Sequence, residues 1–158
     1  MTDRPAPEGG AYLRTIAMPR DANPSGDIFG GWTLSQMDIA GAAFAGTHSG
    51  GRVATVAIDA MKFLRPIEVG DEVSCLCSIE RQGVTSLEIR IETWTRRGGT
   101  APAKVTEGLF TYVALADDGG ARRLGDAPVR RAGRAAGRQR GARRPPAPKP
   151  SRRMPVKG

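Results

Sequence analysis

One carboxylate, Asp38, stands within a segment whose other residues are almost all small or apolar, WTLSQMDIAGAAFAG (32–46). With helical spacing, Asp38 falls on the same face as five such residues, inside an apolar stripe: Leu34, Met37, Gly41, Ala42 and Ala45. Burying an ionised carboxylate is costly unless it is paired or hydrogen-bonded. Asp38 is therefore either a structural hydrogen-bond anchor or a group that does chemistry.

Two glycines, Gly30 and Gly31, precede the expected start of this helix. The N–H groups at a helix start lack intrahelical partners, and the positive end of the helix dipole lies there. Such donors can face a developing negative charge, which is what an oxyanion hole requires. A Gly-Gly pair alone also fits a plain glycine-rich helix start. Together with a carboxylate about two turns further on, it resembles a hydrolytic site without a serine or cysteine nucleophile.

Other catalytic chemistries are poorly supplied by this sequence. His48 is its single histidine, and no G-x-S-x-G motif accompanies it, so a Ser-His-Asp triad is not expected. One histidine with Cys75 and Cys77 in a strand-like segment does not make a zinc site. Phosphate-binding and dinucleotide-binding glycine motifs are absent from the sequence. We expect no metal, and the two cysteines suit small core positions better than a disulfide framework.

Hydrophobic periodicity predicts the elements that hold these residues. A strand over 11–19 precedes a helix over about 32–47, which we expect to end near Gly46, Gly50 and Gly51. Four period-two strands follow, at 52–66, 69–83, 84–97 and 103–116. We expect these four to form an antiparallel meander with one wet and one dry face. The helix, about 22 Å long, would cover the dry face in an α+β fold.

Charge divides the chain into a domain and a tail. The net charge is +8, yet residues 128–158 hold 11 Lys and Arg and no acid, so the remainder is −3. The region 126–158 is rich in Arg, Pro, Ala and Gly, and we expect it to be disordered, as we do residues 1–10. The domain is then 11–125. The tail is either a dispensable solvated extension or an arm for anionic partners, and no aromatic residues interleave its arginines for base stacking.

The sequence also indicates where the protein resides. Its start, MTDRPAPEGG, has no apolar core of a secretory signal. No apolar run approaches the roughly 20 residues of a membrane helix. We expect a cytoplasmic protein that has no membrane partner.

The segment LRTIAMPRDANPSGDIFGGWTLSQMDIAGA contains the long motif D-x-N-x-x-G-D-I-F-G-G-W, followed by S-Q-M-D. With GRVATVAIDAMKFLRPIEVGDEVSC, it resembles the hotdog-fold acyl-CoA thioesterases, most closely the small bacterial YciA type. The resemblance runs from about Tyr12 to about Arg123. It implies a strongly curved antiparallel sheet wrapped around one central helix. It also implies hydrolysis of acyl-CoA to a free acid and CoA, with broad short-to-medium chain preference and no cofactor.

The same resemblance implies homodimers, usually assembled as trimers of dimers, with each active site at the dimer interface. Asp38 matches the family's catalytic carboxylate, acting as a base on water or as the nucleophile itself. Asn23 matches a loop asparagine that helps to hold the water or the thioester across the interface. Gly30 and Gly31 match the pair whose backbone polarises the thioester carbonyl, with the Gly31 N–H as the favoured donor.

Further residues are implied for the rest of the substrate. Phe29, Met61 and Phe63 are expected to line the acyl or pantetheine channel, although each also suits a plain core. Thr85 and Ser86 match a Thr-Ser pair that contacts the CoA chain. Positive side chains for the CoA phosphates are expected among Arg52, Lys62, Arg65 and Arg81.

Two other functions remain open from the sequence. A hotdog dehydratase would need a histidine working with an acidic residue, and His48 is badly placed for that. A non-catalytic acyl-CoA-binding regulatory module, whose basic tail contacts nucleic acid, is the alternative from a different class.

Overall fold

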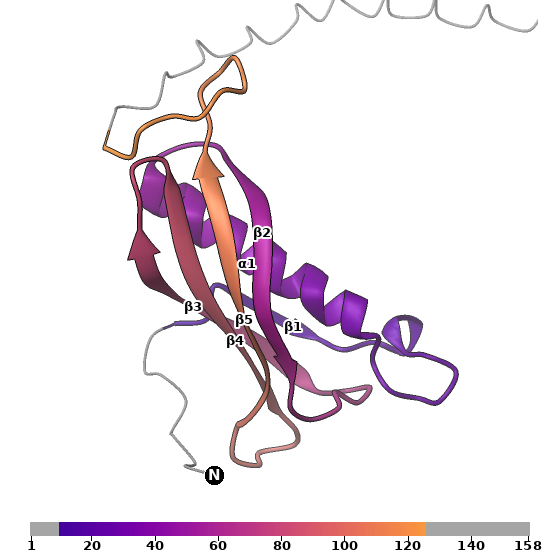
Figure 1. The fold of residues 1–158 in the computed structure, drawn as a ribbon. Coiled ribbons are helices and arrows are strands. Elements are labelled where there is room, and N and C mark those ends of the chain that lie inside the picture. The colour runs from indigo at the N-terminus through magenta and orange to yellow at the C-terminus, as the bar shows by residue number, and fades with distance from the viewer. Residues whose placement is uncertain (1–9, 126–158) are drawn as a thin grey trace, which may run out of the picture.

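The computed structural model describes residues 10–125 of the chain, and in it one antiparallel sheet wraps a single long helix (Figure 1). The helix is α1 (Gly30–Ser49), preceded by the short 3-10 helix η1 (Pro19–Asp21). The strands are β1 (Leu13–Ile16), β2 (Val53–Phe63), β3 (Glu72–Gln82), β4 (Ser86–Arg96) and β5 (Ala103–Ala114). The expected α+β architecture is confirmed. The expectations for residues 1–9 and for the tail 126–158 lie outside the described residues.

The strand order, β1-β3-β4-β5-β2, corrects one expectation. β3, β4 and β5 form a meander, but β2 pairs with β5 instead of β3 and becomes an edge strand. The link 64–71 is too long for a tight turn. It crosses the end of the sheet, where the N–H groups of Leu64 and Arg65 donate to the Val105 carbonyl at 2.8 and 3.3 Å. The Gly70 N–H then donates to the carbonyl of Ala17, which directly follows β1, so β3 begins beside β1.

Helix α1 is longer than predicted at both ends. Gly30 and Gly31 are its first two residues instead of preceding it, and His48 lies in its last turn instead of beyond it. Gly46 does not stop the helix. Gly50 does so, because it adopts the left-handed conformation (φ 70°) that favours glycine.

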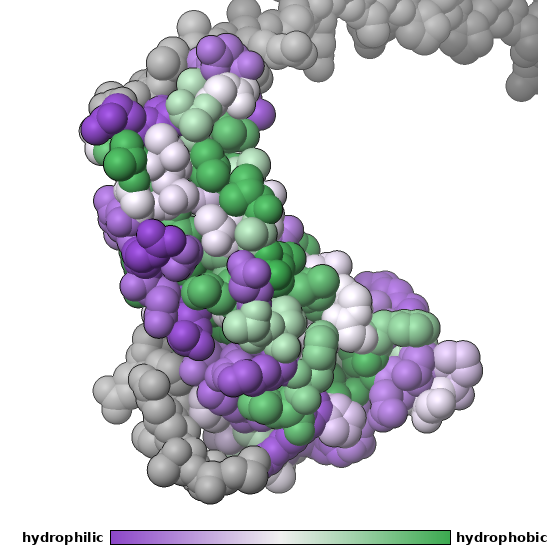
Figure 2. All heavy atoms as spheres, in the orientation of Figure 1, coloured by the Kyte–Doolittle hydropathy of each residue, from purple (hydrophilic) through white to green (hydrophobic). Residues whose placement is uncertain are grey.

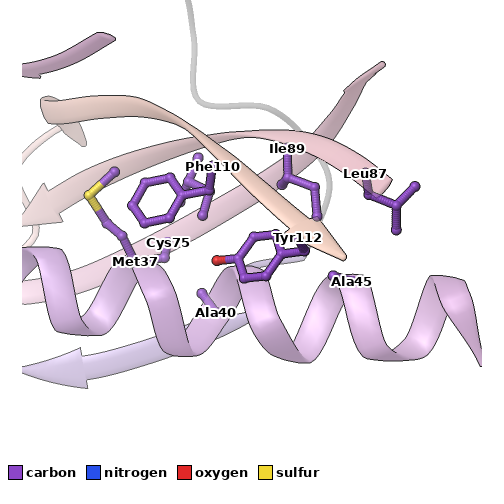
Figure 3. Close-up of a cluster of buried hydrophobic side chains, with 9 residues drawn as sticks. Met37, Ala40, Ala45, Cys75, Leu87, Ile89, Phe110 and Tyr112 are labelled. Atoms are coloured by element: carbon purple, nitrogen blue, oxygen red, sulfur yellow. The ribbon is translucent and has the colours of Figure 1, made fainter. Parts of the chain in front are cut away.

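The core lies between α1 and the concave face of the sheet, as Figure 3 shows for its central residues. Residues from α1, β3, β4 and β5 form it: Met37, Ala40, Ala45, Cys75, Leu87, Ile89, Ile91, Phe110 and Tyr112. The predicted alternation of β4 is confirmed, with Leu87, Ile89, Ile91 and Thr93 buried. Cys75 and Cys77 are free thiols, and burial raises their pKa values to about 11 and about 12. They are packing residues.

The outer face of the sheet carries ion pairs. Arg90 Nε lies 3.0 Å from Glu80 Oε2, and Lys104 Nζ lies 2.8 Å from Glu107 Oε2. These pairs hold the pKa values of both glutamates below their usual range. No helix within residues 10–125 is long and apolar enough to cross a membrane.

Candidate active site

The carboxylate of Asp38 is held from the sheet. Its Oδ1 accepts a hydrogen bond from Thr55 Oγ1 on β2 at 2.7 Å and one from the Tyr112 hydroxyl on β5 at 3.2 Å. Asp38 is half-buried. The buried row of α1 includes Met37, Ala40 and Gly41, and Asp38 lies at the border of this row, not inside it as the sequence predicted. Its second oxygen, Oδ2, receives no hydrogen bond from residues 10–125. One carboxylate oxygen is therefore fixed, and the other is available to a substrate or water.

Sequence reasoning missed Thr55 and Tyr112. They are directly opposite each other in the β2–β5 register. Tyr112 falls in the predicted last strand, and a buried tyrosine needs a partner for its hydroxyl. The buried hydroxyl of Tyr112 needs a partner and the half-buried charge of Asp38 needs a donor, so the sequence could have predicted that the two residues meet. Thr55 had no comparable signal, because its placement depends on which strand pairs with β5.

Two β-bulges decide which side chains of β2 face α1. The register shifts between Thr55 and Ala57 and again between Asp59 and Lys62, where Ala60 takes a positive φ of 50°. Strict alternation from Thr55 would turn Asp59 toward the helix. With the bulges, Asp59 pairs with Leu109 on the outer face instead. The bulged strand thus keeps a second carboxylate away from Asp38.

Met61 and Phe63 both face the helix side of the sheet. Met61 is half-buried against the core, and its sulfur occupies the space where a side chain on Gly108 would lie. Phe63 is exposed, and its ring lies 3.4 Å from the position that a Cβ on Gly30 would take. Met61 therefore packs as core, while Phe63 stands at the start of α1.

The first turn of α1 offers free backbone donors. Its N-cap, Phe29, provides no side-chain cap, and the first intrahelical bond runs from the Thr33 N–H to the Phe29 carbonyl at 3.2 Å. Among the described residues, the N–H groups of Gly30 and Gly31 donate to no partner. A Cβ on Gly31 would meet nothing within 4 Å, so a ligand can reach the backbone there.

A hollow of about 390 Å³ opens beside this helix start. Its walls come from the loop before α1, the first turn of α1, the end of β2 and the link after β2: Ile28, Gly30, Thr33, Phe63, Leu64, Arg65, Pro66 and Ile67. It brings together three predicted substrate residues, Gly30, Phe63 and Arg65. Phe29 is half exposed and does not line it.

Asn23 shapes the loop before α1. Its Oδ1 accepts the N–H groups of Ser25 at 2.9 Å and of Asp27 at 3.1 Å. Within residues 10–125, its side-chain Nδ2 donates to no partner, and the side chain forms no hydrogen bond with Asp38. One chain alone therefore leaves the amide donor of Asn23 unused.

The model of the thioesterase superfamily matches residues 25–102. The chain is 49% identical to the acyl-CoA thioester hydrolase YciA of Salmonella typhimurium over 122 residues. This alignment covers 75% of this chain and 92% of that protein. The chain belongs to the YciA family of acyl-CoA thioester hydrolases. The family predicted from the motif is thereby confirmed.

Solved structures of similar thioesterases agree in fold. Cj0915, a hexameric hotdog fold thioesterase of Campylobacter jejuni, superposes with a TM-score of 0.72 at 39% identity, over 75% of this chain and 92% of that one. HI0827, a hexameric broad specificity acyl-coenzyme A thioesterase, gives a TM-score of 0.71 at 40% identity, over 78% and 86%. The predicted hotdog fold is confirmed.

Two of the residues predicted for this YciA family member lie far from the hollow. Ser86 pairs with Val113, whereas Phe63 pairs with Thr106, seven residues along β5. This separation is about 23 Å along the strands. Thr85 precedes Ser86 at the same distant end. A single chain does not gather all the predicted substrate residues at one place.

The four predicted phosphate-binding residues differ in their partners. Lys62 Nζ lies 3.5 Å from Glu107 Oε1, and Arg81 is hydrogen-bonded to Glu88, which raises the pKa of Arg81. Arg52 and Arg65 form no ion pair with residues 10–125. Of these two, Arg65 lines the hollow beside Gly30.

Proposed function

We propose that this YciA family member hydrolyses acyl-CoA thioesters to a free carboxylic acid and CoA, with Asp38 as the catalytic carboxylate. The observation that supports this most is the asymmetry of the carboxylate. Thr55 and Tyr112 hold Oδ1, and Oδ2 is open. An oriented, partly desolvated carboxylate with one free oxygen suits proton abstraction or direct attack.

The reaction follows one of two balanced courses. In the first, Oδ2 takes a proton from water as the water oxygen bonds to the thioester carbonyl carbon. In the second, Oδ2 itself bonds to that carbon, and water later cleaves the anhydride. In both, the C–S bond breaks and CoA leaves as a thiolate. The pKa of a thiol, about 8.5, makes this a good leaving group near neutral pH.

The Gly31 N–H is the proposed donor to the carbonyl oxygen as negative charge develops there. Gly31 and Asp38 of one chain are seven residues apart on α1. This is about 10.5 Å along the helix axis, too far for both groups to touch one carbonyl. We therefore assign Gly31 of one chain and Asp38 of a second chain to each site.

The free edge of β2 supports a homodimer. β2 has a strand on one side only, and Val56 and Ile58 expose their apolar side chains there. Figure 2 shows apolar side chains gathered on the face that carries β2. An exposed, apolar edge strand is a ready template for pairing with a second copy. By analogy with the hexameric relatives, three such dimers would assemble together.

The remaining residues take roles at this shared site. The Nδ2 of Asn23 would bind the water or the thioester, and Thr85 and Ser86 would contact the CoA chain from the other subunit. Arg65 is the favoured partner for a CoA phosphate, because it is unpaired within the described residues and borders the hollow. By analogy with HI0827, a broad specificity acyl-coenzyme A thioesterase, we propose that acyl chains of varied, short-to-medium length are accepted. We place the reaction in the cytoplasm, where acyl-CoA substrates are made and used.

The test is an acyl-CoA chain-length panel assayed with the wild type and with Asp38→Asn, together with melting temperatures. We expect the wild type to hydrolyse short and medium chains and Asp38→Asn to lose about 1,000-fold in kcat without melting earlier. If the wild type hydrolyses no substrate on the panel but binds CoA, it is the binding module instead. If Asp38→Asn stays active, the carboxylate is a structural anchor.

A dehydratase receives less support from the geometry. His48 lies ten residues after Asp38 on α1, about 15 Å away along the axis. Its ring is stacked on Phe44 in the last turn of the helix. The two groups of one chain do not share a substrate.

A further inference from the structure

The Tyr112 hydroxyl enters a gap in the side-chain layer of α1 at Gly41. Tyr112 is completely buried, and its ring lies against α1 with the hydroxyl directed toward the helix (Figure 3). The hydroxyl oxygen is 3.2 Å from the Asp38 carbonyl oxygen and 3.2 Å from Asp38 Oδ1. A Cβ at position 41 would come within 3.0 Å of the Tyr112 hydroxyl oxygen, Tyr112 Cζ and Ile91 Cδ1. Only glycine leaves room for this approach.

We propose that Tyr112 is a positioning residue for the Asp38 carboxylate and that Gly41 is the notch that admits its hydroxyl. The inference rests on the proposed function, because Tyr112 acts through Asp38 and does not touch the substrate. From β5 it shares its single proton between Oδ1 and the Asp38 carbonyl oxygen, while Thr55 donates to Oδ1 from β2. Two donors from different strands hold Oδ1, which restricts rotation of the carboxylate and leaves Oδ2 without a donor from residues 10–125.

The chemistry of the site keeps this donor protonated. Burial raises the pKa of Tyr112 well above its usual range, and the negative charge of Asp38 raises it further. Tyr112 therefore remains a neutral donor, suited to holding Asp38 but not to exchanging a proton with it.

Tyr112→Phe tests the role of the hydroxyl while it keeps the ring that packs in the core. We expect kcat to fall about tenfold or more with KM unchanged, since an oriented carboxylate matters in the transition state more than in substrate binding. The matched control is Tyr12→Phe, which removes the hydroxyl of the chain's other tyrosine, half exposed beside Phe44. That control should retain wild-type kcat. A wild-type kcat in Tyr112→Phe would overturn the proposal.

Gly41→Ala tests the notch. It should displace the Tyr112 hydroxyl and lower kcat at least as far as Tyr112→Phe does. Added to Tyr112→Phe, it should lower kcat little further, because the displaced oxygen is already gone. Gly46→Ala is the control on the same helix, where a Cβ meets its nearest atom, the Gly51 carbonyl oxygen, at 3.4 Å. Fully multiplicative losses in the double variant would contradict the shared mechanism.

A crystal structure of Tyr112→Phe gives a readout that does not depend on turnover. We expect the Asp38 carboxylate to rotate or to occupy two conformers. A single, unchanged conformer would overturn the positioning role even if the wild type proved inactive. An active wild type, an inactive Asp38→Asn and an unaffected Tyr112→Phe would refute this inference and leave the proposed function standing.

Discussion

Strands β4 and β2 lie on either side of β5 and differ in almost every respect. β4 alternates from Ser86 to Thr93, buries Leu87, Ile89 and Ile91 on one face and carries ion-paired charges on the other. β2 has two bulges, a positive φ at Ala60 and exposed apolar side chains. β4 is complete within one chain, whereas β2 carries Thr55 to Asp38 and leaves its outer edge unpaired. The regular pairing of β4 contributes to the stability of the sheet, whereas the irregular pairing of β2 shapes the proposed active site.

Among substitutions at the proposed active site, Gly31→Pro should give the largest loss of activity. Proline is tolerated in the first turn of a helix but has no N–H, so the proposed donor to the carbonyl oxygen disappears. We expect kcat to fall about 100- to 1,000-fold with the fold retained. Steady-state kinetics and circular dichroism measure both.

Gly31→Ala is the matched variant for this prediction. It keeps the N–H, and its Cβ meets nothing within 4 Å. It should therefore keep most of the activity. Equal losses in the alanine and proline variants would show that the backbone donor is not the group that matters at this position.

A charge on the free edge should give a smaller effect on turnover. Val56 is 58% exposed on β2, and Val56→Lys would place a lysine where a second chain would pair. We expect a shift toward monomers in light scattering and about a tenfold loss of activity. Val84→Lys is the control, because Val84 is 59% exposed in the turn between β3 and β4. An unshifted oligomer in Val56→Lys would refute the β2 interface.

The smallest expected effect is on stability, from the ion pair between Arg90 on the regular strand β4 and Glu80 on β3. Arg90 holds the pKa of Glu80 below its ordinary value of 4.5, so the pair contributes to stability above pH 4.5 and loses that contribution as the pH falls through the lowered pKa. Both side chains are exposed, so we expect Glu80→Gln to change the melting temperature only slightly near neutral pH. Below that window, the melting temperatures of the variant and the wild type should converge. A gap that widens on acidification would contradict this assignment.

The regular parts of the molecule were predictable from local pattern. The alternation of β4 and the small, apolar character of α1 gave a sheet covered by a helix, and the charge of Asp38 marked the site. The edge position of β2 was not predictable in the same way, because pairing with β5 is a long-range choice. Thr55 and Tyr112 depend on that choice, and the two bulges reverse the face on which the β2 residues between them lie. The motif resemblance identified the family without these details.

The central claim is that each site combines Asp38 of one chain with Gly31 of another, and mixed oligomers test it most directly. Asp38→Asn and Gly31→Pro chains, each inactive alone, would be co-expressed with different tags and the mixed species purified. In a mixed dimer, one of the two sites keeps both groups intact. We therefore predict that purified mixed dimers recover about half of the wild-type kcat per dimer. Activity no higher than that of the two parent variants would contradict the shared site.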